Sequence, residues 1–131
     1  MQYTKGIYDL LTGSTSMTDR VSTKIFPIEA PSGTAMPFIT YEHVSATVFH
    51  TKEGTAYEQA RVEVVVYATS YNDALGIGKI CRDLLDGQSI SSSSPIRYTI
   101  DRLFFMDEEI ERLENPDRYA YVLEVEAFVL I

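Results

Sequence analysis

The sequence contains one cysteine, two histidines and no tryptophan. A single thiol, Cys81, cannot form a disulfide within the chain, so the fold has to rest on a hydrophobic core. Neither His43 nor His50 has a cysteine or a second histidine at the spacing that metal sites use. We therefore expect no disulfide, no metal and no other cofactor. A free thiol also fits a protein that is made in a reducing cytoplasm.

Positive charge is also scarce, with 11 lysines and arginines against 19 aspartates and glutamates and a net charge of −8. A chain this acidic is repelled by the phosphates of nucleic acids and by anionic membranes. Its apolar runs are only as long as a strand, and residues 1–8 lack the pattern of a signal peptide. We expect neither sequence-specific binding to nucleic acid nor a membrane partner.

The negative charge is concentrated towards the C-terminus. From Asp101 to Glu126, nine acidic residues outnumber three basic ones, which is a net −6 of the chain's −8. Two interpretations stay open: a solvated loop and strand face, which is the common meaning of such a stretch, or an acidic surface with a function. The nine acids are Asp101, Asp107, Glu108, Glu109, Glu111, Glu114, Asp117, Glu124 and Glu126.

Hydrophobic periodicity predicts two helices and five strands. One helix covers Tyr3–Leu11, and the other begins at Ser70, which forms a capping box with Asp73, and ends at Gly87. Pro27 confines the first strand to an edge of the sheet. The predicted strands are Lys24–Ile28, Phe38–Val48, Glu58–Thr69, Ile96–Met106 and Tyr119–Ile131.

Three polar connections link these elements. Phe49–Tyr57 is too long for a two-residue turn and predicts a protruding hairpin. Gln88–Pro95, with four consecutive serines, predicts a flexible surface segment. Asp107–Asp117 predicts an acidic loop in which the spacing of Ile110 and Leu113 allows one turn of helix.

The element order and the hairpin-type links predict an α+β fold. We expect one domain, residues 1–131, with a mostly antiparallel sheet of about five strands and two helices packed on one face. The apolar face of the second helix contains Cys81, which we interpret as a core residue.

Catalytic motifs find little support in the sequence. Gly76-Ile77-Gly78-Lys79 resembles part of a phosphate-binding loop, but it lies inside a predicted helix and lacks the serine or threonine after the lysine. We expect these glycines to let the helix approach the sheet closely. No Gly-x-Ser-x-Gly motif is present, and paired carboxylates such as Glu108 and Glu109 have no predicted catalytic partner. The sequence therefore favours a protein that is not an enzyme.

Aromatic residues are plentiful, with nine tyrosines and six phenylalanines. Phe49, Tyr57 and Tyr71 fall in or beside predicted connections, where such residues often mark a contact surface. Packing at the rim of the sheet explains them equally well, so both interpretations stay open.

Five short segments, in their order and spacing, resemble the tail-completion or tail-to-head joining proteins of long-tailed bacteriophages, also called tail terminators. The resemblance covers nearly the whole chain. The segments are Leu11-Thr12, Lys24-Ile25-Phe26-Pro27, Met36-Pro37-Phe38-Ile39-Thr40-Tyr41, Val66-Tyr67-Ala68-Thr69-Ser70-Tyr71 and Asp73-Ala74.

The resemblance implies a structural role in the virion, at the head-proximal end of the tail. Such subunits form a ring with copies of themselves, commonly a hexamer, that caps the tail tube protein, ends its polymerisation and offers a docking face to a head-completion or stopper protein. DNA passes through the ring, so an acidic lumen would avoid holding its phosphates.

Two groups of residues become candidates for this role. A protruding hairpin suits contact with a neighbouring subunit or with the tube, and part of the acidic segment suits the channel. The candidate interface residues are Phe49, His50, Lys52, Glu53 and Tyr57. The candidate channel-facing acids are Asp107, Glu108, Glu109, Glu111, Glu114, Glu124 and Glu126.

Two other functions remain compatible with the residues. One is a small ligand-binding or regulatory module, which would require an apolar pocket with convergent polar groups. The other is a different component of a phage neck or baseplate with a similar fold.

Overall fold

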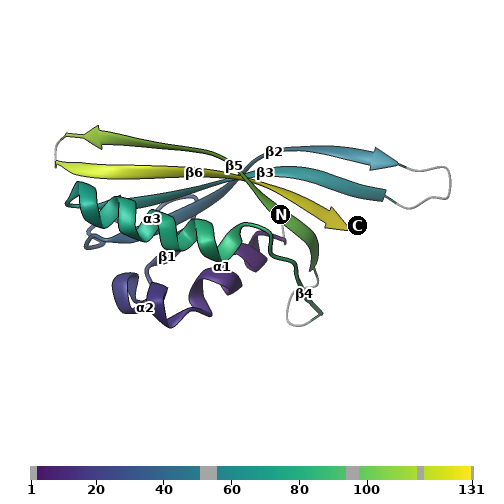
Figure 1. The fold of residues 1–131 in the computed structure, drawn as a ribbon, viewed down its shortest axis with the longest axis horizontal. Coiled ribbons are helices and arrows are strands. Elements are labelled where there is room, and N and C mark those ends of the chain that lie inside the picture. The colour runs from purple at the N-terminus through teal and green to yellow at the C-terminus, as the bar shows by residue number, and fades with distance from the viewer. Residues whose placement is uncertain (1–2, 51–55, 94–97, 115–116, 131) are drawn as a thin grey trace.

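A computed structural model describes residues 3–50, 56–93, 98–114 and 117–130. Within these ranges the chain forms three helices and six strands (Figure 1). The order is α1 (Thr4–Thr12), α2 (Thr15–Val21), β1 (Ile25–Pro27), β2 (Phe38–His50), β3 (Ala56–Ala68), α3 (Tyr71–Leu85), β4 (Ile90–Ser92), β5 (Tyr98–Leu113) and β6 (Arg118–Leu130).

The strands form a single sheet in the order β1-β2-β3-β6-β5-β4. β1 runs parallel to β2, and every other neighbouring pair is antiparallel. The α+β class and the edge position of Pro27 are confirmed, but the sheet is mixed and has six strands among the described residues rather than five. β1 is parallel because the chain from Pro27 to Phe38 returns along a loop instead of a tight hairpin.

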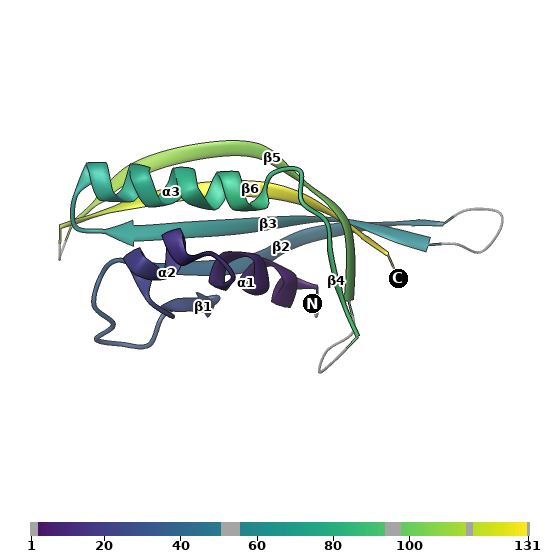
Figure 2. The ribbon, with the colours of Figure 1, turned by 60° about the horizontal axis from the view of Figure 1, so that its bottom comes forward.

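All three helices of the described ranges cover one side of this sheet (Figures 1 and 2). Their apolar faces meet the strands in one core, in which Ile7, Ile77 and Leu123 are almost fully buried. The sequence predicted two helices and missed α2. Only Met17 and Val21 of its seven residues are buried, which is too short an apolar pattern to stand out from its polar neighbours. No helix in the described ranges combines the length and the hydrophobicity needed to cross a bilayer.

The predicted start and apolar face of α3 are confirmed. The Ser70 Oγ accepts a hydrogen bond of 3.1 Å from the Asp73 backbone N–H, which satisfies one free donor of the first turn. Cys81 has no exposed surface, and burial raises its pKa to about 12. A thiol with such a pKa stays protonated and unreactive, so Cys81 serves packing.

The two glycines of α3 differ in their surroundings. A Cβ on Gly78 would lie 2.4 to 2.6 Å from three ring atoms of Tyr121 on β6, so only glycine allows this close approach of helix and sheet. A Cβ on Gly76 would have no neighbour nearer than the Arg20 guanidinium, at 3.9 Å. The expectation of a close approach is therefore confirmed for Gly78 and wrong for Gly76.

The segment predicted as an acidic loop, Asp107–Asp117, is mostly strand. β5 continues to Leu113 and pairs with β6 as far as Leu113 opposite Arg118. The predicted helical turn around Ile110 is wrong, because the backbone there is hydrogen-bonded to β6 and Ile110 packs against the core. Long-range pairing outweighs the local preference of a glutamate-rich segment for helix or loop.

The serine-rich segment Gln88–Pro95 also contains a strand that was not predicted. β4 pairs Ile90 with Ile100 and Ser92 with Tyr98 at the edge of the sheet. Ile90 packs against the core, which supplies the apolar contact that the run of serines lacks. Residues 94–97 lie outside the described ranges.

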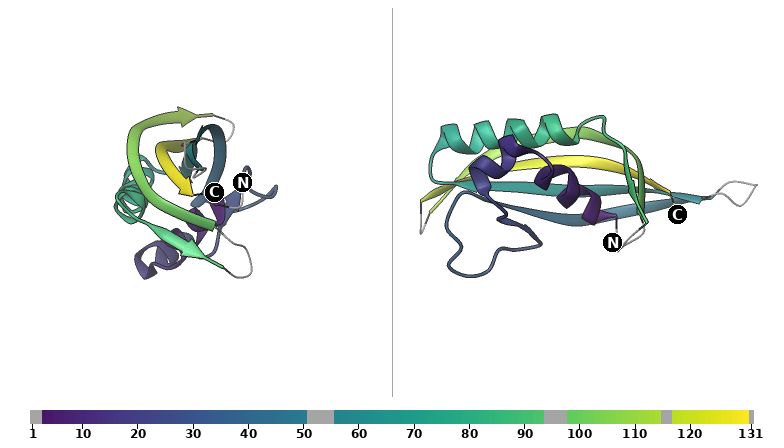
Figure 3. Two further views of the ribbon diagram at one scale, coloured as in Figure 1. Left: turned by 90° about the vertical axis from the view of Figure 1, so that its right-hand side faces the viewer. Right: turned by 90° about the horizontal axis from the view of Figure 1, so that it is seen from below.

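The β2–β3 hairpin extends beyond the helices, which confirms the predicted protrusion (Figure 1). Every residue of β2 from Val44 to His50 is exposed, and Tyr57 is partly exposed on β3. The view down the long axis shows the strands twisting strongly around one another (Figure 3). The projecting part of β2 is Val44–His50, and it pairs with Ala56–Arg61 of β3. We call these two segments together the arm.

Candidate assembly surface

The side of the sheet opposite the helices carries the candidate residues, and we call it the open face. Directly paired residues in neighbouring strands lie on the same side of a sheet. Val62 pairs with Val125 and Val64 pairs with Leu123, and all four are buried beneath the helices. The residues that alternate with these valines on β3, Arg61 and Glu63, therefore belong to the open face.

An acidic row crosses the open face at the middle of the sheet. Glu42 of β2 pairs with Glu63 of β3, Glu63 pairs with Glu124 of β6, and Glu124 pairs with Asp107 of β5. Four carboxylates thus occupy directly opposite positions on four consecutive strands. Glu109 and Glu111 continue along the same side of β5 and extend the negative surface towards one end of the sheet.

Two polar contacts offset part of this charge. The Arg61 Nε lies 2.7 Å from a carboxylate oxygen of Glu124. The Gln59 amide donates a hydrogen bond of 2.5 Å to Glu126. Like charges directly opposite one another on a sheet are destabilising, so one arginine among these acids leaves the row with a net repulsion.

The repulsion is visible at Glu63, which lies in the middle of the row. Burial first, and then the nearby carboxylates of Glu42 and Glu124, raise the pKa of Glu63, with further contributions from Glu109 and Glu111. A raised pKa means that the folded protein disfavours the ionised form. Near neutral pH the folded state therefore carries an electrostatic penalty at this position.

Replacing Glu63 by glutamine should remove this penalty and raise the free energy of unfolding by about 0.5 kcal/mol at pH 7. The gain should disappear below about pH 4, where the glutamate of the unfolded chain is also protonated. Urea unfolding at a series of pH values measures both effects. Glu29→Gln, on an exposed loop residue away from the row, is the matched control and should change little. A Glu63→Gln gain that stayed constant down to pH 3 would contradict the electrostatic explanation.

An aromatic row lies beside the acidic row and begins near the tip of the arm, where Phe49 pairs with Tyr57. Phe49 and Tyr57 stack with centroids 5.0 Å apart, Tyr57 meets Phe128 at 6.2 Å, and Phe128 meets Phe104 edge-on at 5.6 Å. The row therefore spans β2, β3, β6 and β5 on the open face. Phe49 and Phe104 are each 38% exposed. Such a contiguous, partly exposed aromatic surface is typical of a protein contact.

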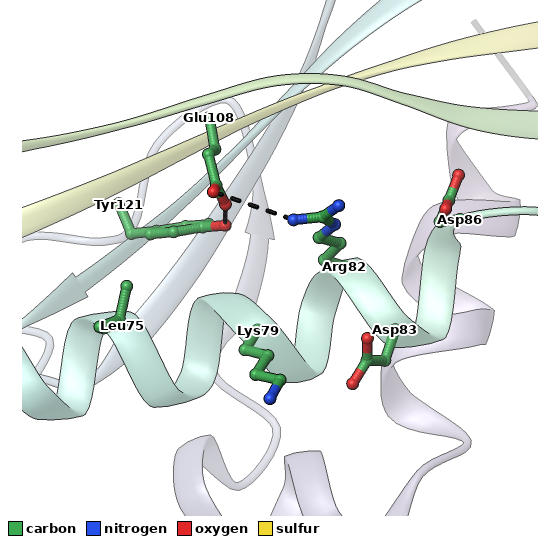
Figure 4. A pocket seen from close by; sticks show the side chains of 7 residues that line it. All are labelled: Leu75, Lys79, Arg82, Asp83, Asp86, Glu108 and Tyr121. Carbon is green, nitrogen blue, oxygen red and sulfur yellow. Dashed lines mark hydrogen bonds and ion pairs between the residues drawn. The ribbon is translucent and has the colours of Figure 1, made fainter.

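A cleft on the helix-covered side lies between α3 and the β5–β6 hairpin (Figure 4). The Arg82 guanidinium lies 3.9 Å from the centroid of the Phe105 ring and 3.9 Å from a carboxylate oxygen of Glu108. The Tyr121 hydroxyl donates a hydrogen bond to Glu108, and burial together with this bond raises the pKa of Tyr121. These contacts hold the hairpin against α3. Five of the seven residues that line the cleft are charged, whereas a typical ligand pocket is lined mainly by hydrophobic and aromatic residues.

The structure brings together five of the seven candidate channel acids. Asp107, Glu109 and Glu111 lie on the open face of β5, and Glu124 and Glu126 lie on the open face of β6. The other two lie elsewhere. Glu108 is on the helix-covered face, where it contacts Tyr121 and Arg82, and Glu114 lies in the turn after β5.

Three of the five candidate interface residues lie on the arm. Phe49 and Tyr57 stack on the open face, and His50 is exposed at the end of β2. Lys52 and Glu53 fall outside the described residues.

Four residues of the open face were missed in the sequence: Glu42 and Glu63 of the acidic row, and Phe104 and Phe128 of the aromatic row. Val62 and Val64 flank Glu63 in the sequence, and this alternation indicates that Glu63 faces away from the core. However, alternation does not reveal which residue of the next strand lies beside it.

The described residues include no group of three or more histidine, cysteine, aspartate or glutamate side chains able to hold a metal ion. The acidic row therefore has the geometry of a charged surface spread over four strands rather than of a coordination site.

Comparisons with known proteins agree with the resemblance seen in the sequence. A search of curated proteins gave no significant match. Among solved structures, 17 chains match significantly. One of them comes from the virion of a native gene transfer agent particle and is 19% identical in sequence. The match has a TM-score of 0.71 and covers 95% of this chain and 92% of the other chain, which shows that the two share a fold. The profile of the tail completion protein gp17 family matches residues 5–130. The chain therefore belongs to the tail completion protein gp17 family and is a structural protein of phage tails.

Proposed function

We propose that this protein is a non-enzymatic subunit of a homo-oligomeric ring, of hexameric type, at the head-proximal end of a phage tail. The ring caps the tube of tail protein, ends its polymerisation and offers a docking face to a head-completion protein. Membership of the tail completion family supports this role. So does the broad open face, which is acidic at its centre and aromatic towards the tip of the arm.

The proposed orientation of the subunit within the ring is based on the acidic row. In a ring through which DNA passes, basic walls would hold phosphates by releasing their counterions, whereas acidic walls repel them. Glu42, Glu63, Glu124 and Asp107 supply such a wall from four strands of one subunit. The open face therefore borders the channel, and the helices form the outer layer.

The proposed contacts with a neighbouring subunit or with the tube are based on the arm and the aromatic row. Phe49 and Tyr57 stand on a hairpin that extends past the helices, within reach of a neighbouring subunit or the tube. Phe104 and Phe128 continue the same surface towards the other edge of the sheet. Partly exposed aromatic side chains of this kind supply much of the binding energy in protein interfaces.

A small ligand-binding module fits the structure less well. The cleft beside α3 is lined chiefly by charged side chains that pair with one another, such as Arg82 and Glu108. The open face, in contrast, is a broad surface with aromatic contacts, which favours assembly.

The oligomer can be tested on the full chain. Light scattering at high protein concentration should give a ring-sized mass, or should do so once tail tube protein is added. Electron microscopy of the product should show a ring with a central channel. A strict monomer that forms no ring with tube protein would contradict the function. A ring with the Glu42–Asp107 row on its outer wall would contradict the proposed orientation alone.

A further inference from the structure

Two strands of the sheet have an outer edge that is covered over only part of its length. β1 pairs with β2 only from Ile39 to Tyr41. On the other side of the sheet, β4 pairs with β5 only from Tyr98 to Ile100. The next residues of β5 are also occupied, because Leu103 exchanges backbone hydrogen bonds with Gly87 and Gln88.

Past these points the described part of the chain places no strand beside either edge. On β2 the uncovered stretch is Val44–His50, which we call the β2 edge. On β5 it is Asp107–Leu113, which we call the β5 edge. Backbone N–H and C=O groups on such an edge are a template for pairing with another strand.

Each edge begins at a β-bulge. The register of β2 shifts between His43 and Ser45, and that of β5 shifts between Phe105 and Asp107. The extra residues at these bulges, Val44 and Met106, are 52% and 47% exposed. A bulge increases the local twist, so each uncovered stretch departs in direction from the covered half of its strand. The β2 edge projects past the helices as part of the arm (Figure 1), whereas the β5 edge stays beside α3, where Glu108 contacts Arg82.

The two edges fit each other in direction and in position. β2, β3, β6 and β5 alternate in direction, so β2 runs opposite to β5. The β2 edge lies at the end of the sheet near Tyr57, and the β5 edge lies at the other end, opposite Arg118–Glu124. A second copy shifted along the strands can therefore place its β5 edge beside the β2 edge as an antiparallel neighbour.

Charge favours this pairing over the pairing of two β5 edges. The β5 edge carries four acids and a single arginine, Arg112, so two copies of it repel each other. The β2 edge, from Val44 to His50, contains neither acidic residues nor lysine or arginine. Pairing with the β2 edge therefore brings no further negative charge next to the acids of the β5 edge.

We propose that the β2 edge of one copy pairs in antiparallel fashion with the β5 edge of the next copy, so that the sheet continues from subunit to subunit. The contact joins two different surfaces of the same chain, which is the type that closes a ring by rotation. The shift along the strands tilts them relative to the ring axis, as in closed barrels. This inference rests on the proposed ring and specifies how its subunits join.

Cysteine cross-linking tests the contact directly. Thr47 pairs with Gln59 and so lies on the open face of the β2 edge, on the same side as Glu109 of the β5 edge. Three double variants combine Thr47→Cys with Asp107→Cys, Glu109→Cys or Glu111→Cys, which samples the possible registers. Cys81 is fully buried and does not interfere. Under mild oxidation, one of the three double variants should form a ladder of covalent oligomers. Its yield of cross-linked oligomers should be at least ten-fold higher than that of the control, which combines Thr47→Cys with Asp19→Cys.

A charge exchange gives a second readout. Thr47→Glu should weaken oligomer formation at least ten-fold, and Thr47→Gln should not. Oligomer formation should be restored when Thr47→Glu is combined with Asp107→Lys, Glu109→Lys or Glu111→Lys, whichever position gives the cross-link. Rings that form normally but give no cross-link in any register would overturn the edge pairing and leave the ring intact. Cross-linking by Thr47→Cys alone would overturn it in favour of two β2 edges. A chain that never forms oligomers would overturn the proposed function and the pairing together.

Discussion

Gly78→Ala should lower the free energy of unfolding by about 1–3 kcal/mol or more, because the new methyl group overpacks the interface between α3 and the sheet. Its Cβ would lie 2.4 Å from the ring of Tyr121, which is only 2% exposed. The ring cannot move away easily, since its hydroxyl is bonded to Glu108 and the neighbouring strands are fully paired. The shift in the urea midpoint measures the loss.

Gly76→Ala is the matched control for this prediction. It lies on the same helix and makes the same chemical change, but its Cβ has only Arg20 within 4 Å, at 3.9 Å. Alanine favours a helix over glycine by about 1 kcal/mol, so this variant should be more stable than the wild type. Equal effects at the two positions would show that helix propensity, rather than contact with Tyr121, decides the outcome.

Phe128→Ala should weaken assembly of the ring or its binding to the tube roughly 30-fold, which corresponds to about 2 kcal/mol for a central interface residue. Phe128 contacts both Tyr57 and Phe104, so its removal divides the aromatic row in two. The isolated chain should lose only about 1–2 kcal/mol of stability, because Phe128 is partly exposed and each aromatic pair contributes modestly. Sedimentation or light scattering at a series of concentrations measures assembly.

Leu75→Ala provides the control for Phe128→Ala. Leu75 is 42% exposed on α3, on the opposite side of the sheet from the aromatic row. Its removal should leave assembly unchanged if contacts are made through the open face. Loss of assembly in Leu75→Ala with normal assembly in Phe128→Ala would place the interface on the helical layer instead.

Local patterns were sufficient for several parts of the fold. The cap at Ser70, the apolar face of α3 and the burial of Cys81 depend on residues within a few positions of one another, and the structure confirms each. The position of Pro27 on an edge strand also follows from local chemistry, because proline cannot donate a hydrogen bond to a neighbouring strand.

Short or polar elements required their tertiary partners. α2 offers only Met17 and Val21 to the core, and β4 is a three-residue strand in a run of serines. The C-terminal half of β5 is rich in glutamate and becomes a strand because β6 is available to pair with it. None of these sequences specifies its structure without the neighbour that completes its hydrogen bonds.

The sequence alone established that the chain is acidic, that apolar and polar residues alternate along its long strands and that it resembles tail-completion proteins. Composition and periodicity decide such properties because they need no knowledge of distant contacts. Only the tertiary structure set Glu42, Glu63, Glu124 and Asp107 in one row and joined Phe49 to Phe104 through two other rings. The register between strands far apart in the chain creates both rows, and register depends on pairing and bulges that no local pattern encodes.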